Sequence, residues 1–322
     1  MPRTKDIAVN DKASRGCEDS PRQFTYVYLT SAPHSGSTLV ACLLGAHAEL
    51  STVGEFGTDF RKEGHCSCGA IYRECPFWHE WSMRAERIGV PFDTGNLDLD
   101  IGPGSSTTSV DDVFYHMFPW KWVDAFRNGL FELHRPLRNR AINSIRRSIV
   151  LAQDLCRHEG SNVFLDTTKN ALQIPFLARH GRVNLKVISL IRDGRGVTNS
   201  LLTREKWSAD ISVGTWLRSI RNQSRAERYV NSENVFRLRL EALCADPQRV
   251  LSELFEFCGV DPDTPGDCTD TQHRHIIGNS MRMHFAGEVR LDEKWRRQLS
   301  DEHLQFFEQR AGELNRSLGY VN

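Results

Sequence analysis

The sequence predicts an α/β fold, with a central parallel sheet of four to five strands flanked by helices. Short apolar runs rich in β-branched and aromatic residues recur along the chain, as is typical of parallel strands buried on both faces. Amphipathic stretches at helical spacing separate several of these runs. The third observation is a loop of small residues between the first run and an apolar helical stretch, which is the arrangement of a P-loop-like phosphate site.

The first strand is predicted to begin at Phe24 and includes the apolar run Tyr26–Leu29. The loop 31–36 (SAPHSG) ends it, and Ser37 and Thr38 can cap the helix that follows. Such a loop directs backbone N–H groups at one point, where the helix dipole adds about half a positive charge. The small side chains there would let a phosphate approach the backbone, so we expect an anion site.

This loop differs from the ATP and GTP signature G-x-x-x-x-G-K-[ST]. Ser31 stands at the position of the first Gly, and Ser37 stands at the position of the Lys. Without that lysine the loop is poorly suited to a triphosphate and its Mg²⁺.

Length and charge limit the remaining function classes. The 322 residues hold 41 basic and 41 acidic side chains, with a pI near 7.2, so nucleic-acid binding is not indicated. No apolar run approaches the length of a membrane span, and the polar start has no signal-peptide core. We therefore expect a disordered lead-in at 1–23, a single domain at 24–322 and a cytoplasmic location; the oligomeric state is left open.

An irregular insertion is predicted at about 57–112, with a short helical piece near 81–87. It contains Cys66, Cys68 and Cys75, beside His65 and His79. Because C-x-C with a third cysteine seven residues on is not a usual zinc spacing, we expect three unrelated thiols and no metal. A zinc site and a disulfide remain alternatives. The aromatic-rich stretch 114–126 after the insertion is expected mainly to pack in the core.

The middle of the chain predicts a helix at 137–158 and a second buried strand at 162–168. Because ligands gather at the carboxyl ends of strands in open parallel sheets, Asp166, Thr167 and Lys169 are expected to face the site.

A third strand is predicted at 185–191, followed directly by Arg192. A guanidinium at a strand tip suits a phosphate. If a helix begins near Gly194, Ser200 lies about two turns along it and can add a hydroxyl.

Beyond this point we expect a broken helical region at 207–230, a fourth strand at 235–240 and a helix ending at Gly259. Glu241, just after the fourth strand, is interpreted as structural. A loop rich in Arg, Gly and Asn follows at 273–299, and a terminal helix is predicted at 301–318.

The motif P-H-S-G-S-T-L, followed by G-A-H and G-E, resembles the 5′-phosphosulfate loop of the sulfotransferases, which use 3′-phosphoadenosine 5′-phosphosulfate (PAPS) as donor. Arg192 and Ser200 have the spacing with which that family binds the 3′-phosphate. In the family the position of His34 is usually Lys or Arg. The resemblance implies these donor-binding residues: Pro33, His34, Ser35, Gly36, Ser37, Thr38, Arg192, Ser200 and, from a C-terminal loop, Asn279 and Arg282.

The resemblance also implies sulfuryl transfer to a hydroxyl or amine of a small-molecule or carbohydrate acceptor, with adenosine 3′,5′-bisphosphate as product. Glu55 matches the glutamate base of the carbohydrate and protein-tyrosine branches more closely than any residue matches the histidine of the phenol branch. Lys169 and His34 would add positive charge, and no metal is required. An ATP-dependent nucleotide or small-molecule kinase, or a non-catalytic nucleotide-binding protein, are the alternatives.

Overall fold

A computed structural model describes residues 23–57, 64–93, 97, 99, 117–264 and 274–321. Apart from Gln23, the expected lead-in at 1–23 lies outside the described residues. The same holds for 58–63, 94–96, 98 and 100–112 of the expected insertion, and for Phe114 and Tyr115 of the aromatic stretch.

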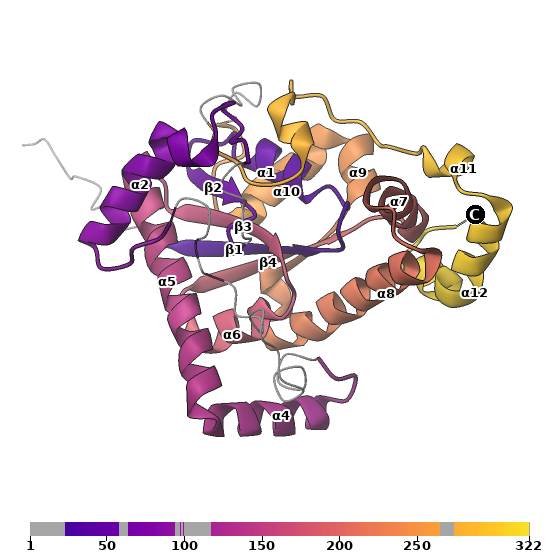
Figure 1. The fold of residues 1–322 in the computed structure, drawn as a ribbon, viewed down its shortest axis with the longest axis horizontal. Coiled ribbons are helices and arrows are strands. Elements are labelled where there is room, and N and C mark those ends of the chain that lie inside the picture. The colour runs from indigo at the N-terminus through magenta and orange to yellow at the C-terminus, as the bar shows by residue number, and fades with distance from the viewer. Residues whose placement is uncertain are drawn as a thin grey trace, which may run out of the picture.

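A parallel sheet of five strands forms the centre of the molecule (Figure 1). The strand order is β2-β3-β1-β4-β5, and every neighbouring pair is parallel. The strands are β1 Thr25–Ser31, β2 Leu50–Gly54, β3 Val163–Lys169, β4 Asn184–Ile191 and β5 Val235–Arg239. Four of them confirm the predicted strands, and β2, at the edge of the sheet, was not predicted.

Alternate side chains of β1 enter two different hydrophobic cores. Tyr26 and Tyr28 pack on the face covered by α5 (Arg135–Glu159) and α6 (Gln173–His180). Val27 and Leu29 pack on the opposite face, under α1 (Ser37–Leu44) and α10 (Pro247–Cys258). All seven residues of β1 are buried, which explains why it reads as a continuous apolar run rather than an alternating one.

A third apolar cluster lies beside the sheet, around Trp216 and Phe307. It joins α7 (Gly194–Ser200), α8 (Ala209–Ala226) and the terminal helix α12 (Asp301–Ser317), as Figure 1 shows on its right-hand side. The π-helical turn η2 (Leu201–Glu205) continues α7. The shorter elements are η1 Tyr72–Glu74, η3 Glu227–Tyr229, η4 Ser232–Asn234, α9 Leu240–Ala245, η5 Ser280–Met283 and α11 Trp295–Gln298.

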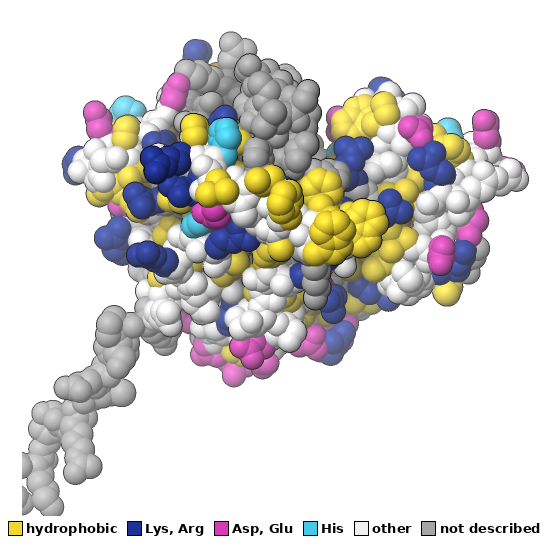
Figure 2. Space-filling model, turned by 90° about the horizontal axis from the view of Figure 1, so that it is seen from below, with side chains coloured by type: hydrophobic (Ala, Val, Ile, Leu, Met, Phe, Trp, Pro, Cys, Tyr) yellow, Lys and Arg dark blue, Asp and Glu magenta, His cyan; other side chains and the backbone are white. Residues whose placement is uncertain are grey.

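Two helices differ from the sequence-based expectations. The helical piece expected near 81–87 is the end of a longer helix, α2 (Pro76–Arg87), whose Trp78 and Trp81 are fully buried. The rings expected in the core at 120–126 are instead exposed on α4 (Lys121–Leu133), where 73% of Trp122 is accessible. Figure 2 views the molecule from the side of α4, and hydrophobic side chains gather on this face.

The order of the strands reverses at β1, which is the topological switch point of the sheet. From β1 the chain builds β2 and β3 on one side, and then crosses to build β4 and β5 on the other. In open α/β sheets, ligands bind at the carboxyl ends of the strands on either side of such a point. Within the described part of the chain, no helix has the length and apolar character needed to cross a membrane.

Candidate functional site

A cavity of about 500 Å³ lies at the carboxyl ends of the strands. It is bounded by the loop after β1, the ends of β2 and β3, the tip of β4, the turn η2 and the segment 278–292. Most of the residues predicted from the sequence line it: Pro33, His34, Gly36, Ser37, Thr38, Glu55, Lys169, Arg192, Ser200 and Asn279. Ser35 is a buried residue of the loop, and neither Ser35 nor Arg282 lines the cavity.

The phosphate loop ends at Gly36, which is the N-cap of α1 with φ +94° and makes no side-chain cap. The prediction that Ser37 or Thr38 caps this helix is therefore wrong. The first hydrogen bond of the helix runs from Val40 N to Gly36 O (3.1 Å), so the amides just before Val40 have no partner within the helix. The Thr38 hydroxyl instead accepts from Asn279 N (3.0 Å), which joins the loop to the C-terminal segment.

His34 contributes little positive charge to the loop at neutral pH. Its Nε2 lies 3.0 Å from Oε1 of Glu205, which favours the protonated ring. Burial is the larger effect and lowers the pKa of His34 below its ordinary value. The positive charge that the lysine or arginine of the resembling loops would supply must therefore come from elsewhere, and Lys169, Arg192, Arg204 and Arg290 all line the cavity.

Glu55 and Lys169 meet on the cavity wall from two adjacent strands. Lys169 Nζ donates to Glu55 Oε1 at 2.5 Å, and both side chains are more than three-quarters buried. Gly54, just before Glu55, has φ +77°, and a Cβ there would lie 2.1 Å from the carbonyl oxygen of Ile277. A glycine is therefore required at position 54, where the backbone of Ile277 comes close, and the next residue, Glu55, lines the cavity.

Thr167, which was expected to face the site, is buried and does not line the cavity, and the same holds for Asp166. Its carboxylate accepts from Tyr26 Oη (2.9 Å) and from the backbone N (2.8 Å) and hydroxyl of Thr168. Burial raises the pKa of Asp166 to about 6, although these donors oppose the shift. Its contacts indicate a positioning role, because they fix the turn that leads to Lys169.

Arg192 leaves the tip of β4 and is mostly buried. Its Nη1 donates to the carbonyl of His34 (2.7 Å), and its Nη2 donates to the carbonyl of Asp292 (2.9 Å). The guanidinium thus links the phosphate loop to the C-terminal segment at the cavity wall. Ser200, six residues after α7 begins, donates to the carbonyl of Gly196 (3.0 Å) and faces the same cavity.

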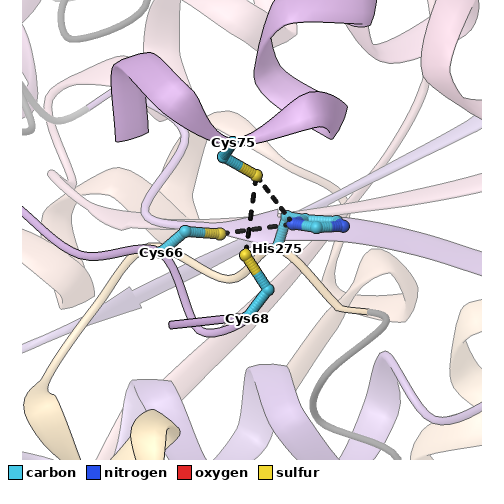
Figure 3. Close-up of side chains that lie close together, drawn as sticks. All are labelled: Cys66, Cys68, Cys75 and His275. Carbon is cyan, nitrogen blue, oxygen red and sulfur yellow. Dashed lines mark hydrogen bonds between the residues drawn. The ribbon is translucent and has the colours of Figure 1, made fainter. Parts of the chain in front are cut away.

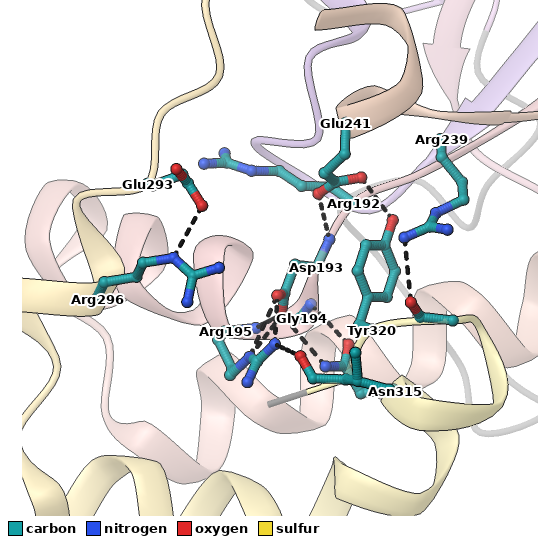
Figure 4. Close-up of polar contacts among 12 residues, drawn as sticks. Arg192, Asp193, Gly194, Arg195, Arg239, Glu241, Glu293, Arg296, Asn315 and Tyr320 are labelled. Atoms are coloured by element: carbon teal, nitrogen blue, oxygen red, sulfur yellow. Dashed lines mark hydrogen bonds and ion pairs between the residues drawn. The ribbon is translucent and has the colours of Figure 1, made fainter. Parts of the chain in front are cut away.

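A buried polar network holds the backbone after Arg192 (Figure 4). Glu241 Oε1 accepts from Asp193 N (3.0 Å), and its Oε2 accepts from the hydroxyl of Tyr320 (2.7 Å). Asn315 accepts from Gly194 N and donates to Asp193. These contacts support the interpretation of Glu241 as structural, because it links the tip of β4 to Tyr320, just after α12.

Two cationic residues of the cavity, Arg204 and Arg290, were missed by sequence reasoning. Arg204 follows Ser200 by four residues on η2, a helical spacing that a search for further cations beside Ser200 would have found. Arg290 lies in a loop, and its place in the cavity has no local sequence signal. Arg282, which was expected to bind the donor, holds neighbouring protein groups: the carbonyls of Gly278 and His65 and the hydroxyl of Tyr72.

The expectation of three unrelated thiols is not met. Cys66, Cys68 and Cys75 converge with His275, and none of the three cysteines is in a disulfide. His65 and His79, the histidines near them in sequence, are not part of this group.

Residues 122–265 match the model of the sulfotransferase family. The sulfotransferase domain of the Synechococcus PCC 7002 olefin synthase aligns over 94% of this chain and 98% of its own, with a TM-score of 0.52 and 17% identity. The sulfotransferase domain from the curacin biosynthetic pathway aligns over 93% and 98%, with a TM-score of 0.46 and 15% identity. No curated protein sequence is significantly similar to the chain.

The likeness to the Synechococcus domain shows a shared fold across nearly the whole of both chains. Residues 122–265, somewhat less than half of the chain, are in addition similar to the sulfotransferase family.

Proposed function

We propose that the chain transfers the sulfuryl group of PAPS to a hydroxyl or amine of a small-molecule or carbohydrate acceptor. The observation that carries the proposal is the Glu55–Lys169 pair on the wall of a cavity that also contains the phosphate loop and Arg192. A carboxylate that can take a proton and a cation that can stabilise a leaving phosphate are the groups that sulfuryl transfer needs.

The reaction is an in-line displacement at sulfur. The acceptor oxygen or nitrogen attacks the sulfur, and its proton passes to the Glu55 carboxylate. The bond between the sulfur and the bridging oxygen breaks, and its electron pair leaves with the 5′-phosphate of adenosine 3′,5′-bisphosphate. The developing charge on that phosphate is stabilised by Lys169 and by N–H groups of the loop at Gly36 and Ser37.

The donor is proposed to span the cavity with its two phosphate ends in different places. The 5′-phosphosulfate would lie against the loop 33–38, and the 3′-phosphate against Arg192 and Ser200. The hydrogen bond from Arg192 to His34 O supports this arrangement, because it holds the two phosphate sites in one rigid unit. The backbone N of Asn279 donates to the Thr38 hydroxyl, and this hydrogen bond would hold the C-terminal segment over the nucleotide.

A comparison of nucleotides by thermal shift separates this proposal from its two alternatives. We expect adenosine 3′,5′-bisphosphate to stabilise the chain and Mg·ATP to have little effect. A ligand at about 100 times its Kd adds about 2.7 kcal/mol of stability, enough to raise the Tm by several degrees. Stabilisation by Mg·ATP alone would favour the kinase alternative and contradict the proposal.

The acceptor is best found by incubating the chain with radiolabelled PAPS and a panel of sugars, phenols, sterols and amines. Transfer of label to at least one class, absent without enzyme, is the expected result. Binding of adenosine 3′,5′-bisphosphate with no transfer to any class would favour the non-catalytic alternative.

A further inference from the structure

Four side chains from two distant parts of the chain converge outside the catalytic cavity. Cys66, Cys68 and Cys75 come from the segment before α2, and His275 comes from a segment 200 residues later. The three sulfur atoms and one ring nitrogen all lie within 4.8 Å of one another. Figure 3 shows the four side chains pointing toward a common centre.

The shortest distances within this group are close to the ligand-to-ligand distances of a tetrahedral metal site. A zinc ion bound at about 2.3 Å from sulfur and about 2.0–2.1 Å from nitrogen sets ligand-to-ligand distances of about 3.5–3.8 Å. Nδ1 of His275 lies 3.2 Å from the sulfur of Cys66 and 3.3 Å from that of Cys75, and the sulfurs of Cys68 and Cys75 are 3.6 Å apart. A disulfide would need about 2.05 Å between the sulfurs.

We propose that these four residues bind a structural Zn²⁺ ion. Three thiolates and one imidazole form a common zinc ligand set, and this soft set disfavours Mg²⁺ and Ca²⁺, which prefer oxygen. Because four protein ligands complete a tetrahedron, the ion has no open position for water or substrate, so its role is structural rather than catalytic.

The backbone around the cysteines is built to present their sulfurs. In the turn at 66–69, Gly69 N donates to Cys66 O (2.9 Å), and Cys66 N donates to Ala70 O (2.8 Å). His65 and Ile71 pair across this turn as a short antiparallel bridge. Cys75 is the N-cap residue of α2, which fixes its direction from the other side.

The histidine ligand is held in place by its neighbours. The ring of Phe77, on the first turn of α2, stacks on His275 with centroids 4.2 Å apart and planes inclined by 7°. The Ser67 hydroxyl donates to the carbonyl of Arg274 and accepts from Ile276 N (3.0 Å). Contacts that orient a ligand ring from outside the coordination shell are typical of metal sites.

The proposed ion would join two segments that continue directly into the catalytic cavity. Two residues after His275, Ile277 N donates to Val53 O (2.7 Å), and Ile277 O accepts from Glu55 N (3.0 Å). The backbone N of Asn279 then donates to the hydroxyl of Thr38, in the first turn of α1 just after the phosphate loop. The zinc site would thereby fix the backbone that carries Glu55 and the segment that covers the donor.

The intact, untagged chain supplies the first test, which depends on no variant. Elemental analysis is expected to find about one zinc per chain, since one tetrahedron uses all four ligands. Exchange of zinc for Co²⁺ is expected to give the intense visible bands of tetrahedral cobalt and the charge-transfer absorption of thiolate ligands. Absence of zinc both as purified and after reconstitution under reducing conditions would overturn the proposal, as would a Cys68–Cys75 disulfide in the peptide mass map.

Variants then assign the ligands. Cys68→Ser and His275→Ala are expected to lose the bound zinc, whereas His79→Ala, an exposed histidine on α2, and Cys156→Ser, a buried cysteine in α5, are expected to keep it. Retention of a full zinc equivalent in both ligand variants would exclude this site even if the wild-type chain contains zinc.

Hydrogen exchange tests the structural consequence independently of enzymatic activity. In Cys68→Ser, or after chelation of the wild-type ion, the amides of Glu55 and Ile277 are expected to exchange faster, while those in β4 remain protected. Unchanged protection of both amides after complete loss of zinc would overturn the role assigned to the ion. Zinc content and hydrogen exchange can both be measured on a chain that shows no sulfuryl transfer. The zinc proposal and the proposed function can therefore fail independently.

Discussion

Lys169 and Glu55 form a 2.5 Å ion pair across the carboxyl ends of β2 and β3, within the cavity that contains the phosphate loop. The pair unites a candidate base with a candidate cation before any substrate binds. In the proposed reaction the two groups act on opposite sides of the sulfur: Glu55 on the incoming acceptor, and Lys169 on the leaving phosphate. Their separate contributions can therefore be measured with single variants.

Glu55→Gln is expected to reduce kcat by about 10²–10⁴-fold, the usual contribution of a general base, because the amide keeps the shape of the side chain and loses its basicity. Affinity for adenosine 3′,5′-bisphosphate, measured by calorimetry, should change little. Turnover near the wild-type level with a verified acceptor would contradict the assignment of the base.

Glu55→Ala offers a control for the same assignment. The truncated side chain leaves room for a small carboxylate, so added formate is expected to restore part of the turnover. Formate should not restore activity to Lys169→Ala, whose defect is the loss of a positive charge.

Lys169→Met should lower kcat by about 10²–10³-fold, comparable to the loss of one donor to a developing anion. Donor affinity should also weaken, because the ammonium lines the cavity. Lys169 has φ +74°, so the substitution is compared with Arg182→Met, an exposed residue with φ +51°. If both variants lose the same stability but Lys169→Met keeps its kcat, the charge of Lys169 has no catalytic role.

The parts of the fold with strong local patterns were predictable. Strands β1, β3 and β4 each contain a cluster of apolar residues, and the phosphate loop and Arg192 directly follow β1 and β4. Strand β2 was missed because its five residues, LSTVG, are short and half polar, and it packs at the sheet edge. The sequence therefore indicated Glu55 and Lys169 singly but could not show that they are paired.

Other relationships depend on tertiary structure alone. The contact between Cys66 and His275 joins positions 209 residues apart, which no spacing rule relates. The rings of Trp120, Trp122 and Phe126 have a composition typical of a core, yet the structure exposes them on α4, because burial depends on what packs against a helix rather than on its residues. Arg282 has the charge expected of a donor ligand but does not line the cavity, and it donates instead to the carbonyls of Gly278 and His65.

Ser200→Ala tests the proposed 3′-phosphate site. Loss of one hydroxyl donor costs about 0.5–1.5 kcal/mol, so adenosine 3′,5′-bisphosphate should bind about 2–10-fold more weakly while adenosine 5′-monophosphate binds as before. Arg192→Ala should weaken the bisphosphate more, by roughly ten- to hundredfold.

Arg192 also holds the carbonyl of His34 in the phosphate loop. Its replacement is therefore expected to reduce binding of the monophosphate to a smaller degree. Equal losses for the two nucleotides in Ser200→Ala would show that the 3′-phosphate lies elsewhere.

The buried carboxyl of Asp166 gives a prediction about stability and pH. Its pKa in the folded chain is raised to about 6, whereas the pKa of an aspartate in the unfolded chain is about 3.9. Between these values the folded state binds more protons than the unfolded state, so this group adds stability below about pH 4 and loses that contribution as the pH rises through about 6. Asp166→Asn removes the titration and keeps an oxygen to accept from Thr168.

The free energy of unfolding of Asp166→Asn relative to wild type is therefore expected to rise with pH between about 4 and 6, by up to about 1.4 kcal/mol per unit. Urea unfolding at several pH values in this range measures the difference, in which every group common to the two proteins cancels. Asp154→Asn serves as the control, because Asp154 pairs with Arg84 away from the cavity. A constant difference between Asp166→Asn and wild type would show that Asp166 does not titrate in this range. A difference that falls with pH would show that hydrogen bonds from Tyr26 and Thr168 outweigh burial and keep the carboxylate ionised.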